Sequence, residues 1–371
     1  MKINKLHIVA FDVPYPPNYG GVIDIFYKIK DLHDLGILIY LHVYEYGRGF
    51  PEELETYCEE IYYYSRSNSI FNFLSFTPFI VKTRSSSKLI KNLNTIKAPI
   101  LFEGLHTTYP LIKNTFIDQK ILVRTHNIEH YYYNGLAKSE ANLFKKIFFW
   151  IESLKLKYYQ TILNKADNIL TISPFEHSYF EIIFNEKASY IPVFHQNKKL
   201  TISNKIGNKI LYHGDLRVSD NIKVVHFLIK TFKDFNYNLT IASSFENQAI
   251  IKEIDKYSNI QFQKINSADC IKTLFDETHI NILLTFQKTG IKLKLINSLY
   301  QGKFIIANSE MIEDTGLENL CELANTKSEI KNKVIELIYK EFTEDYVRNR
   351  EQELIKFNTK TNALKIIELL N

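Results

Sequence analysis

Short apolar runs rich in β-branched residues alternate with longer amphipathic stretches along almost the whole chain. This alternation is typical of parallel sheets whose strands are joined by crossover helices. In the first half it predicts strands at 6–11, 37–43, 60–64, 99–103, 119–124 and 168–172. It predicts helices at 22–34, 86–95, 106–114, 139–165 and 174–184, the last with Ser173 as N-cap and Pro174 in its first turn.

The second half repeats the pattern, with predicted strands at 208–213, 238–242, 260–263, 280–285 and 303–307. The helices between them are predicted at 221–234, 246–257, 268–277 and 292–301. Because 371 residues are too many for one compact core, we expect two doubly wound α/β domains. We place them at 1–195 and 208–342, joined by a polar linker at 196–207. Residues 343–371 are predicted to form a C-terminal helix that crosses back to the N-terminal domain.

Composition excludes several classes of protein. The chain is 45% hydrophobic and 23% charged, which indicates a globular protein, and its net charge of +5 forms no basic stripe for nucleic acid. Three separated cysteines predict a reduced, cytoplasmic protein. No signal peptide or membrane-spanning segment is expected, and neither half carries a G-x-G-x-x-G or P-loop pattern.

Ligands of parallel sheets bind beyond the carboxyl ends of the strands, so the loops after the strands are the candidate sites. After the first strand, Gly20 and Gly21 open a helix in PPNYGG, where backbone N–H groups can approach a phosphate or a sugar. A rigid turn that only requires glycine is the alternative. After the fourth strand, FEGLH brings Glu103 and His106 to the same edge. A histidine there can orient a sugar hydroxyl or a leaving phosphate, or can be purely structural.

A cluster of polar residues follows the next strand: Arg124, His126, Asn127, Glu129 and His130. The run from His126 to His130 matches the zinc pattern H-x-x-E-H. That site needs both histidines on one helix face, whereas this run directly follows a strand and puts His126 in the turn. A polar sugar-binding edge is therefore favoured, and no metal is expected.

In the second half, Gly214 ends a strand and lets the backbone pass close to a ligand, and Arg217 is a candidate phosphate partner. A loop with solvated charges is the alternative. The stretch TFQKTGIKLKLINSLYQGK then enters a helix near Lys292, where free amides and the helix dipole favour an anion. Lys294 is offset from Lys292 by two residues and need not face the same way. The donor-binding candidates here are Gln287, Thr289, Gly290, Ile291, Lys292 and Asn297.

The predicted helix at 143–163 interleaves aromatic and aliphatic residues with lysines. Its apolar face can pack on its own domain, and the alternative is peripheral contact with an anionic membrane surface.

The order of these motifs resembles that of GT-B glycosyltransferases, specifically the retaining, family-4-like group. The resemblance lies in PPNYGG, FEGLH, RTHNIE, YHGDL and GIKLKLINSLYQGK, and it covers essentially the whole chain. It implies two Rossmann-like domains facing a central cleft, with a nucleotide-sugar held mainly by the C-terminal domain. It also implies transfer without a metal or other cofactor.

The resemblance further implies that Gly290 and Lys292 face the diphosphate and that Asn297 replaces the family's ribose-binding glutamate. Gly20 and Gly21 would lie near the donor phosphate or the acceptor, and His106 near the transferred sugar. Glu103 and His126 are further catalytic candidates, and Arg124, Asn127 and Glu129 are placed on the acceptor or phosphate side. Asp215 and Asn221 stand where the family has Arg and Lys. Thr289 and Asn297 stand where it has its paired glutamates.

The predicted function is transfer of a hexose, with retention, from a UDP- or GDP-sugar to a glycan or lipid-linked acceptor. The expected setting is bacterial surface polysaccharide synthesis, in the cytoplasm or at the inner face of the membrane. A nucleotide-sugar epimerase of the same fold, a non-catalytic nucleotide-sugar-binding protein and a zinc hydrolase are the alternatives.

Overall fold

The protein is described here by a computed structural model covering residues 4–67, 69–113, 116–140, 142–202, 209–286 and 293–371. Its described residues form two compact units, each with its own sheet and core. The first unit holds the residues up to Gln196 together with Lys356–Asn371. The second unit holds the described residues from Asn197 to Ile355.

The first unit contains a seven-stranded sheet in the order β3-β2-β1-β4-β5-β6-β7, with every neighbouring pair parallel. Its strands are β1 (Lys5–Ala10), β2 (Leu38–Glu45), β3 (Glu60–Ser65), β4 (Ile100–Glu103), β5 (Ile121–Arg124), β6 (Asn168–Thr171) and β7 (Ala188–Tyr190). The chain runs outward from β1 through β2 to β3 and then returns to the other side of β1 with β4. The carboxyl ends of β1 and β4 therefore mark the switch point of the sheet, where ligands of such folds bind.

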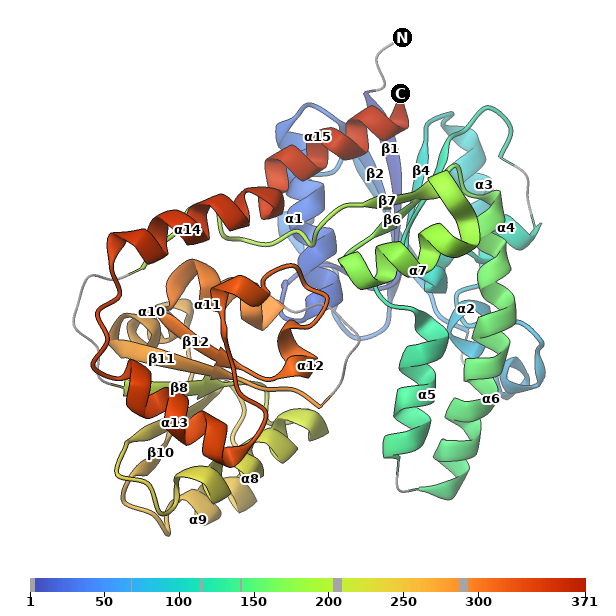
Figure 1. Cartoon of the computed structure of the whole chain (residues 1–371). Helices are drawn as coiled ribbons and strands as arrows, with labels where there is room; N and C mark the ends of the chain where they lie inside the picture. The colour runs from blue at the N-terminus through green and yellow to red at the C-terminus, as the bar shows by residue number, and fades with distance from the viewer. Residues whose placement is uncertain (1–3, 68, 114–115, 141, 203–208, 287–292) are drawn as a thin grey trace. The chain divides into compact units, whose positions relative to one another are not determined.

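Helices cover both faces of this sheet because alternate residues of each strand point to opposite sides. On β1, Ile8 joins one apolar cluster and the adjacent Val9 joins another. The α-helices of the unit are α1 (Gly20–Asp34), α2 (Phe79–Lys82), α3 (Ser87–Thr95), α4 (Tyr109–Lys113), α5 (Glu129–Ser139), α6 (Leu143–Tyr159), α7 (Pro174–Phe184) and α15 (Thr359–Leu370). Helix α15 lies beside α1 and adds Ala363, Ile366 and Leu370 to the core that contains Ile8 (Figure 1).

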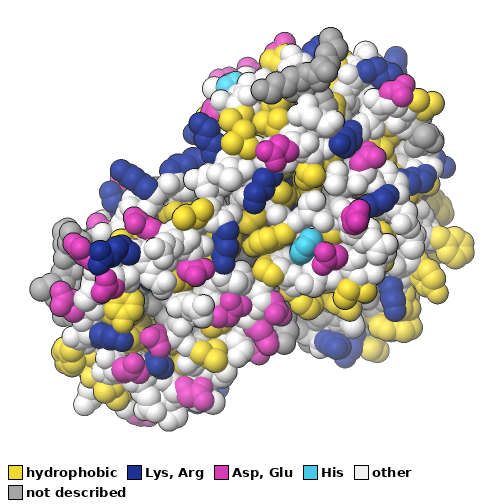
Figure 2. Space-filling model, turned by 45° about the horizontal axis from the view of Figure 1, so that its top comes forward, with side chains coloured by type: hydrophobic (Ala, Val, Ile, Leu, Met, Phe, Trp, Pro, Cys, Tyr) yellow, Lys and Arg dark blue, Asp and Glu magenta, His cyan; other side chains and the backbone are white. Residues whose placement is uncertain are grey.

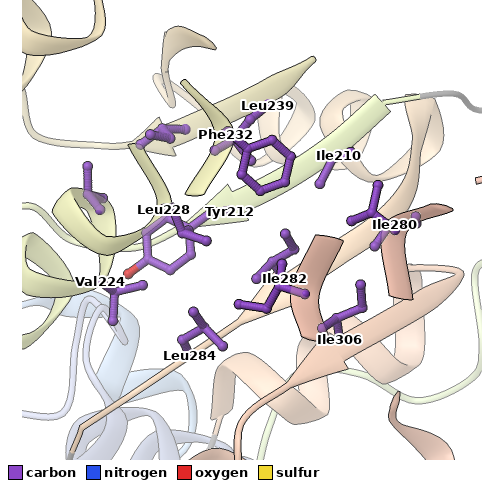
Figure 3. Close-up of a cluster of buried hydrophobic side chains, with 14 of the residues drawn as sticks. Ile210, Tyr212, Val224, Leu228, Phe232, Leu239, Ile280, Ile282, Leu284 and Ile306 are labelled. Atoms are coloured by element: carbon purple, nitrogen blue, oxygen red, sulfur yellow. The ribbon is translucent and has the colours of Figure 1, made fainter. Parts of the chain in front are cut away.

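The second unit contains a six-stranded parallel sheet in the order β10-β9-β8-β11-β12-β13. Its strands are β8 (Lys209–His213), β9 (Leu239–Ser243), β10 (Ile260–Lys264), β11 (Thr278–Leu283), β12 (Phe304–Ala307) and β13 (Glu322–Leu323). Its α-helices are α8 (Ser219–Phe232), α9 (Gln248–Ile254), α10 (Ala268–Glu277), α11 (Leu293–Gln301), α12 (Ser309–Ile312), α13 (Lys327–Leu337) and α14 (Glu344–Leu354). Figure 3 shows how Val224, Leu228 and Phe232 from α8 pack on Tyr212 and Ile282 of the sheet.

The predicted class, two doubly wound parallel sheets, is confirmed. Ser173 caps α7 as expected, because its side chain accepts a hydrogen bond from the Glu176 N–H at 3.2 Å. Two helix predictions differ from the structure. The helix expected at 139–165 is confirmed as α6 (Leu143–Tyr159) followed by a 3-10 helix at Gln160–Lys165, but the separate helix α5 before it was not predicted. The helix expected at 343–371 is divided into α14 and α15, and Asn358 caps the second by accepting from Thr361 N–H at 3.0 Å.

None of the helices in the described ranges is both long enough and apolar enough to cross a membrane.

Candidate functional site

In the first unit, Phe11 follows β1 and lies at the centre of the switch-point edge. Its ring centroid is 5.3 Å from that of His106 and 5.4 Å from that of His126. Gly21, in the first turn of α1, packs so closely on this ring that a Cβ atom there would lie 2.6 Å from Phe11 Cζ. Three of the predicted site residues, Gly21, His106 and His126, are thus gathered around one aromatic ring, and packing explains why residue 21 is glycine.

The position of His106 depends on Gly104, which directly follows β4 and begins the turn that carries His106. Gly104 has φ of +77°, a conformation that residues with a Cβ atom rarely adopt. A Cβ atom at this position would also lie 2.8 Å from His106 Nδ1. Only glycine therefore lets the imidazole fold back over the end of its own strand.

His106 lies next to Glu129, the first residue of α5, with 3.9 Å between Nδ1 and Oε1. Both atoms are buried, and neither has a hydrogen-bond partner among the described residues. Burial lowers the pKa of His106 well below its usual value, and the charge of Arg84 lowers it further. Burial raises the pKa of Glu129 to about 8, although the Asn127 amide opposes the change. Near neutral pH the pair is an uncharged imidazole beside an uncharged carboxylic acid.

Two further polar atoms at this edge are buried without partners in the described structure, His126 Nδ1 and Asn127 Oδ1. Buried polar atoms are nearly always hydrogen-bonded in native proteins. Together with His106 Nδ1 and Glu129 Oε1 they form a set of buried polar atoms that can hydrogen-bond the hydroxyl groups of a sugar.

Glu103 and Arg124 lie deeper, in a charged network whose side chains are 0% exposed. Lys28 Nζ is 2.8 Å from Asp24 Oδ2 and 2.7 Å from Glu103 Oε1. Arg124 donates two hydrogen bonds to Asp24, at 2.9 and 3.1 Å. His126 donates from Nε2 to Glu103 Oε2 at 3.0 Å. The network joins α1 to the ends of β4 and β5 with two positive and two negative side chains.

The buried charges stabilise one another. Burial alone would raise the pKa of Asp24, but Arg124 and Lys28 outweigh it and hold the pKa below its usual value. The pKa of Glu103 is lowered in the same way, since Lys28 and the His126 hydrogen bond outweigh the effect of burial. These contacts favour a positioning role for Glu103 and Arg124 over the catalytic and acceptor-side roles predicted for them. His126 connects the buried charged network to the unpartnered polar atoms near His106. Its Nε2 atom binds Glu103, and its Nδ1 atom has no hydrogen-bond partner in the described structure.

The loop before α1 is braced by residues that the sequence does not mark. Asp12 accepts a hydrogen bond from Tyr19 Oη at 2.6 Å, and Arg48 donates to the Val13 carbonyl at 2.7 Å and to Asn18 Oδ1 at 3.1 Å. Arg48 lies about 30 residues away in the sequence, so no local pattern predicts the contact. These bonds hold Gly20, at the first position of α1, in place.

The zinc alternative does not fit the geometry. Helix α5 begins at Glu129, so His126 precedes the helix and cannot share one of its faces with His130. Among the described residues, Asp24, Glu103 and His126 are the one group close enough to share an ion. Lys28 and Arg124 already neutralise these carboxylates.

In the second unit, Gly214 follows β8 and faces a lysine from α11. Lys294 Nζ would lie 3.1 Å from a Cβ atom at Gly214 and donates to Asn221 Oδ1 at 2.7 Å. Asn221 also accepts from Tyr212 Oη at 3.2 Å and donates to the Asp215 carbonyl at 2.9 Å. Burial and the charge of Lys294 together lower the pKa of His213 to about 3. The ammonium group of Lys294 therefore lies at the carboxyl end of β8.

Arg217, predicted as a phosphate partner, is bound to its own loop. It forms an ion pair with Asp215 at 2.7 Å, and its guanidinium lies 3.4 Å from the centre of the Phe245 ring. Asp220 joins the loops after β8 and β11, since its side chain accepts from Thr285 Oγ1 at 2.8 Å and from Phe286 N–H at 3.2 Å. The arginine's charge is thus partly neutralised, and its contact with phosphate stays a prediction.

Asn297 lies on α11 and accepts a hydrogen bond from Asn197 Nδ2 at 2.7 Å. Its oxygen is therefore engaged within the second unit, and its predicted contact with a ribose stays a prediction. Gln287, Thr289, Gly290, Ile291 and Lys292 lie outside the described residues. Lys294, which is not among the donor-binding residues predicted from the sequence, is a further candidate because it lies beside Gly214 and Asn221.

No family model matches the chain. An "Uncharacterized 44.6 kDa protein in cps region" of Klebsiella pneumoniae is 30% identical over 351 residues, 88% of each chain. Among solved structures, sucrose-phosphate synthase of Thermosynechococcus elongatus has a TM-score of 0.70 at 13% identity, covering 99% of this chain and 98% of that one. Anabaena HepE in complex with UDP has a TM-score of 0.69 at 11% identity, covering 99% of both chains.

These likenesses extend over both units and over nearly the full length of each compared protein. The chain thus has the GT-B fold of glycosyltransferases and belongs to the same family as the Klebsiella pneumoniae protein of the cps region.

Proposed function

We propose that this protein is a glycosyltransferase that moves a hexose from a nucleotide-diphosphate sugar to a glycan or lipid-linked acceptor. The fold supports this proposal, as does the UDP bound by HepE, a structural neighbour. The relative in a cps region supports a place in surface polysaccharide synthesis. UDP is the first donor nucleotide to test, and GDP is the second.

The observation that carries the proposal is the position of Lys294. The family-4-like glycosyltransferases that the sequence resembles have a lysine where this chain has Asn221. Here Lys294 extends from α11 to that position, and its Nζ atom lies 2.7 Å from Asn221 Oδ1. A lysine beside the glycine that ends the central strand can bind a diphosphate as a point charge. The second unit would thereby stabilise the charge that develops on the leaving nucleotide.

In the first unit, the uncharged pair His106 and Glu129 would hydrogen-bond the hydroxyls of the transferred sugar. Neither residue carries a formal charge near neutral pH, so the pair does not repel the anionic donor. Glu103 is held by Lys28 and His126 and does not serve as a nucleophile. We propose instead that the leaving phosphate accepts the proton of the acceptor hydroxyl, with retention at the sugar and without a metal ion.

Nucleotide binding tests this proposal most directly. Wild-type protein should show a thermal shift with UDP or GDP and with the corresponding sugar donor. Lys294→Gln should weaken binding by about tenfold or more, because it removes a charge-assisted contact of roughly 1.5–3 kcal/mol. The matched control is Lys252→Gln, an exposed lysine on α9 of the same unit.

Unchanged binding by Lys294→Gln would remove Lys294 from the site. Transfer is measured by incubation with labelled donor and acceptor glycans, and His106→Ala should abolish transfer while leaving UDP binding intact. Conversion of the donor sugar to an epimer without any acceptor would contradict the proposed reaction.

A further inference from the structure

One whole face of α6 is apolar and exposed to solvent. We call it the α6 face. Its seven side chains are 41–83% exposed: Leu143, Phe144, Ile147, Trp150, Ile151, Leu154 and Tyr158. At 3.6 residues per turn they occupy an arc of about 120° in which no polar residue falls. The opposite side of the helix buries Glu152, Ser153 and Leu156 against the unit.

The loop before α2 extends this apolar surface. Phe71, Leu74 and Phe76 are 74%, 81% and 98% exposed. The loop is fixed to the edge of the α6 face, because Phe73 contacts Phe148 with ring centroids 5.4 Å apart. Lys155 Nζ also donates to the Phe73 carbonyl at 3.1 Å. Figure 2 shows hydrophobic side chains gathered along the right-hand edge, on the side where Figure 1 draws α2 and α6.

Positive charge borders the same surface. Residues 138–159 contain five lysines and two glutamates, and one of these glutamates, Glu152, is buried and bound to Lys155 and to the Phe79 N–H. A groove of about 380 Å³ between α5 and α6 is lined by Lys138 and Lys146 together with Leu143, Ile147 and Trp150. Lys157 flanks the α6 face on that same side of the helix.

This combination identifies the kind of partner. A contiguous exposed apolar surface marks an interaction site, because single exposed apolar residues are common but wide patches are not. A second copy of the chain would bring two lysine-bordered patches of like charge together, since a two-fold interface pairs each patch with itself. Anionic lipid instead offers phosphates to the lysines and an apolar interior to the aromatic side chains. Trp and Tyr, both present on the α6 face, are enriched at the interface between a membrane and water.

We propose that the α6 face docks on the surface of an anionic lipid bilayer. The apolar side chains would enter the boundary between headgroups and acyl chains, and the flanking lysines would bind lipid phosphates. The helix would lie in the plane of the surface. This docking does not depend on the proposed glycosyl transfer, because none of its residues belongs to either candidate site.

Vesicle sedimentation of the full chain tests the proposal. Wild-type protein should bind vesicles made of equal parts phosphatidylglycerol and phosphatidylcholine, bind pure phosphatidylcholine weakly, and lose binding as salt increases. The variant Phe144→Ser/Ile151→Ser should reduce partitioning by about tenfold or more. The matched control is Phe175→Ser/Ile182→Ser, which removes two exposed apolar side chains from α7 of the same unit.

Equal loss of binding in the control, or no loss in the α6 variant, would overturn the proposal. Failure of the wild-type protein to bind anionic vesicles would also overturn the proposal. So would the finding that the wild-type protein is a dimer that the α6 substitutions dissociate. Melting temperature and UDP binding of both variants are measured alongside. Because these readouts require no lipid, they separate failure of docking from failure of the proposed function.

Discussion

Glu129 lies 5% exposed beside His106, and its carboxyl group keeps its proton in the folded protein at pH values where the unfolded chain loses it. The pKa of the folded state, about 8, exceeds the ordinary value of 4.5. The folded state therefore binds more protons than the unfolded state between these values. The contribution of Glu129 to stability is fully present below pH 4.5 and is lost as pH rises toward 8.

Glu129→Gln removes this titration while keeping the shape of the side chain. We expect the variant to gain stability relative to wild type as pH rises from about 5 to about 8, by a few kcal/mol at the upper end. Urea unfolding at several pH values measures the difference. Glu181→Gln, at an exposed position on α7, should show no such trend, and a constant difference for Glu129→Gln would mean that Glu129 is ionised in the folded state.

The location of two predicted site residues could be read from one short motif each, whereas their roles stay predictions. FEGLH and PPNYGG predicted His106 and Gly21 at one edge, and both lie around Phe11. The sequence did not identify Lys294, because the side to which a lysine at the start of α11 turns depends on Asn221, 73 residues away. The buried partners of Glu103 were missed for the same reason, since Lys28 lies 75 residues from it in sequence.

At the scale of elements, the charged network fixes α1 against the sheet. Asp24 accepts from Lys28, from Arg124 and from the Phe194 N–H, which follows β7. Helix α1, the end of β5 and the segment after β7 are therefore held by one carboxylate, and Lys28 extends the network to Glu103 at the end of β4. Direct contact with substrate is not needed to explain these residues.

Asp24→Asn should test this role. The substitution leaves two buried cations facing the single carboxylate of Glu103, and we expect the free energy of unfolding to fall by about 3 kcal/mol. Asp34→Asn, at the exposed end of the same helix, is the matched control and should change stability little. Denaturant unfolding measures both, and equal stability of Asp24→Asn and wild type would rule out the network as the anchor of α1.

The elements that sequence predicted best are the buried central strands, because their apolar runs are short and rich in β-branched residues. Helix α5 escaped prediction because Tyr131–Tyr133 and Gly135 give it low helix propensity and no clear apolar stripe. It forms because it packs along α6 in the folded unit, a tertiary contact that local pattern does not show. The break between α14 and α15 depends on Asn358, whose capping role is hidden in a run that is otherwise rich in helix formers.

At the scale of the whole molecule, the two apolar clusters of the first unit and the apolar core of the second unit share no residue. We therefore expect two unfolding transitions, each sensitive to substitutions in its own core. Ile366→Ala, in α15, should destabilise the first unit by about 3 kcal/mol, because it empties a fully buried position. Ile282→Ala should act in the same way on the second unit.

Calorimetry should resolve the two transitions. UDP bound at the proposed site should raise the melting temperature of the second unit, so the transition that added UDP shifts is assigned to that unit. Lys365→Ala, at an exposed position on α15, is the control for Ile366→Ala. A single transition that both core variants shift equally would show that the units unfold together.

The packing of α15 also orders events during synthesis. Ala363, Ile366 and Leu370 belong to the core built around β1 and α1, yet they are translated after every residue of the second unit. While the ribosome is still extending the chain, the first unit therefore exposes an apolar groove along α1. The second unit can therefore finish folding before the first. This order is the reverse of the usual one, in which the N-terminal domain folds first. A chaperone bound along α1 of the nascent chain would have to dissociate before α15 could pack there.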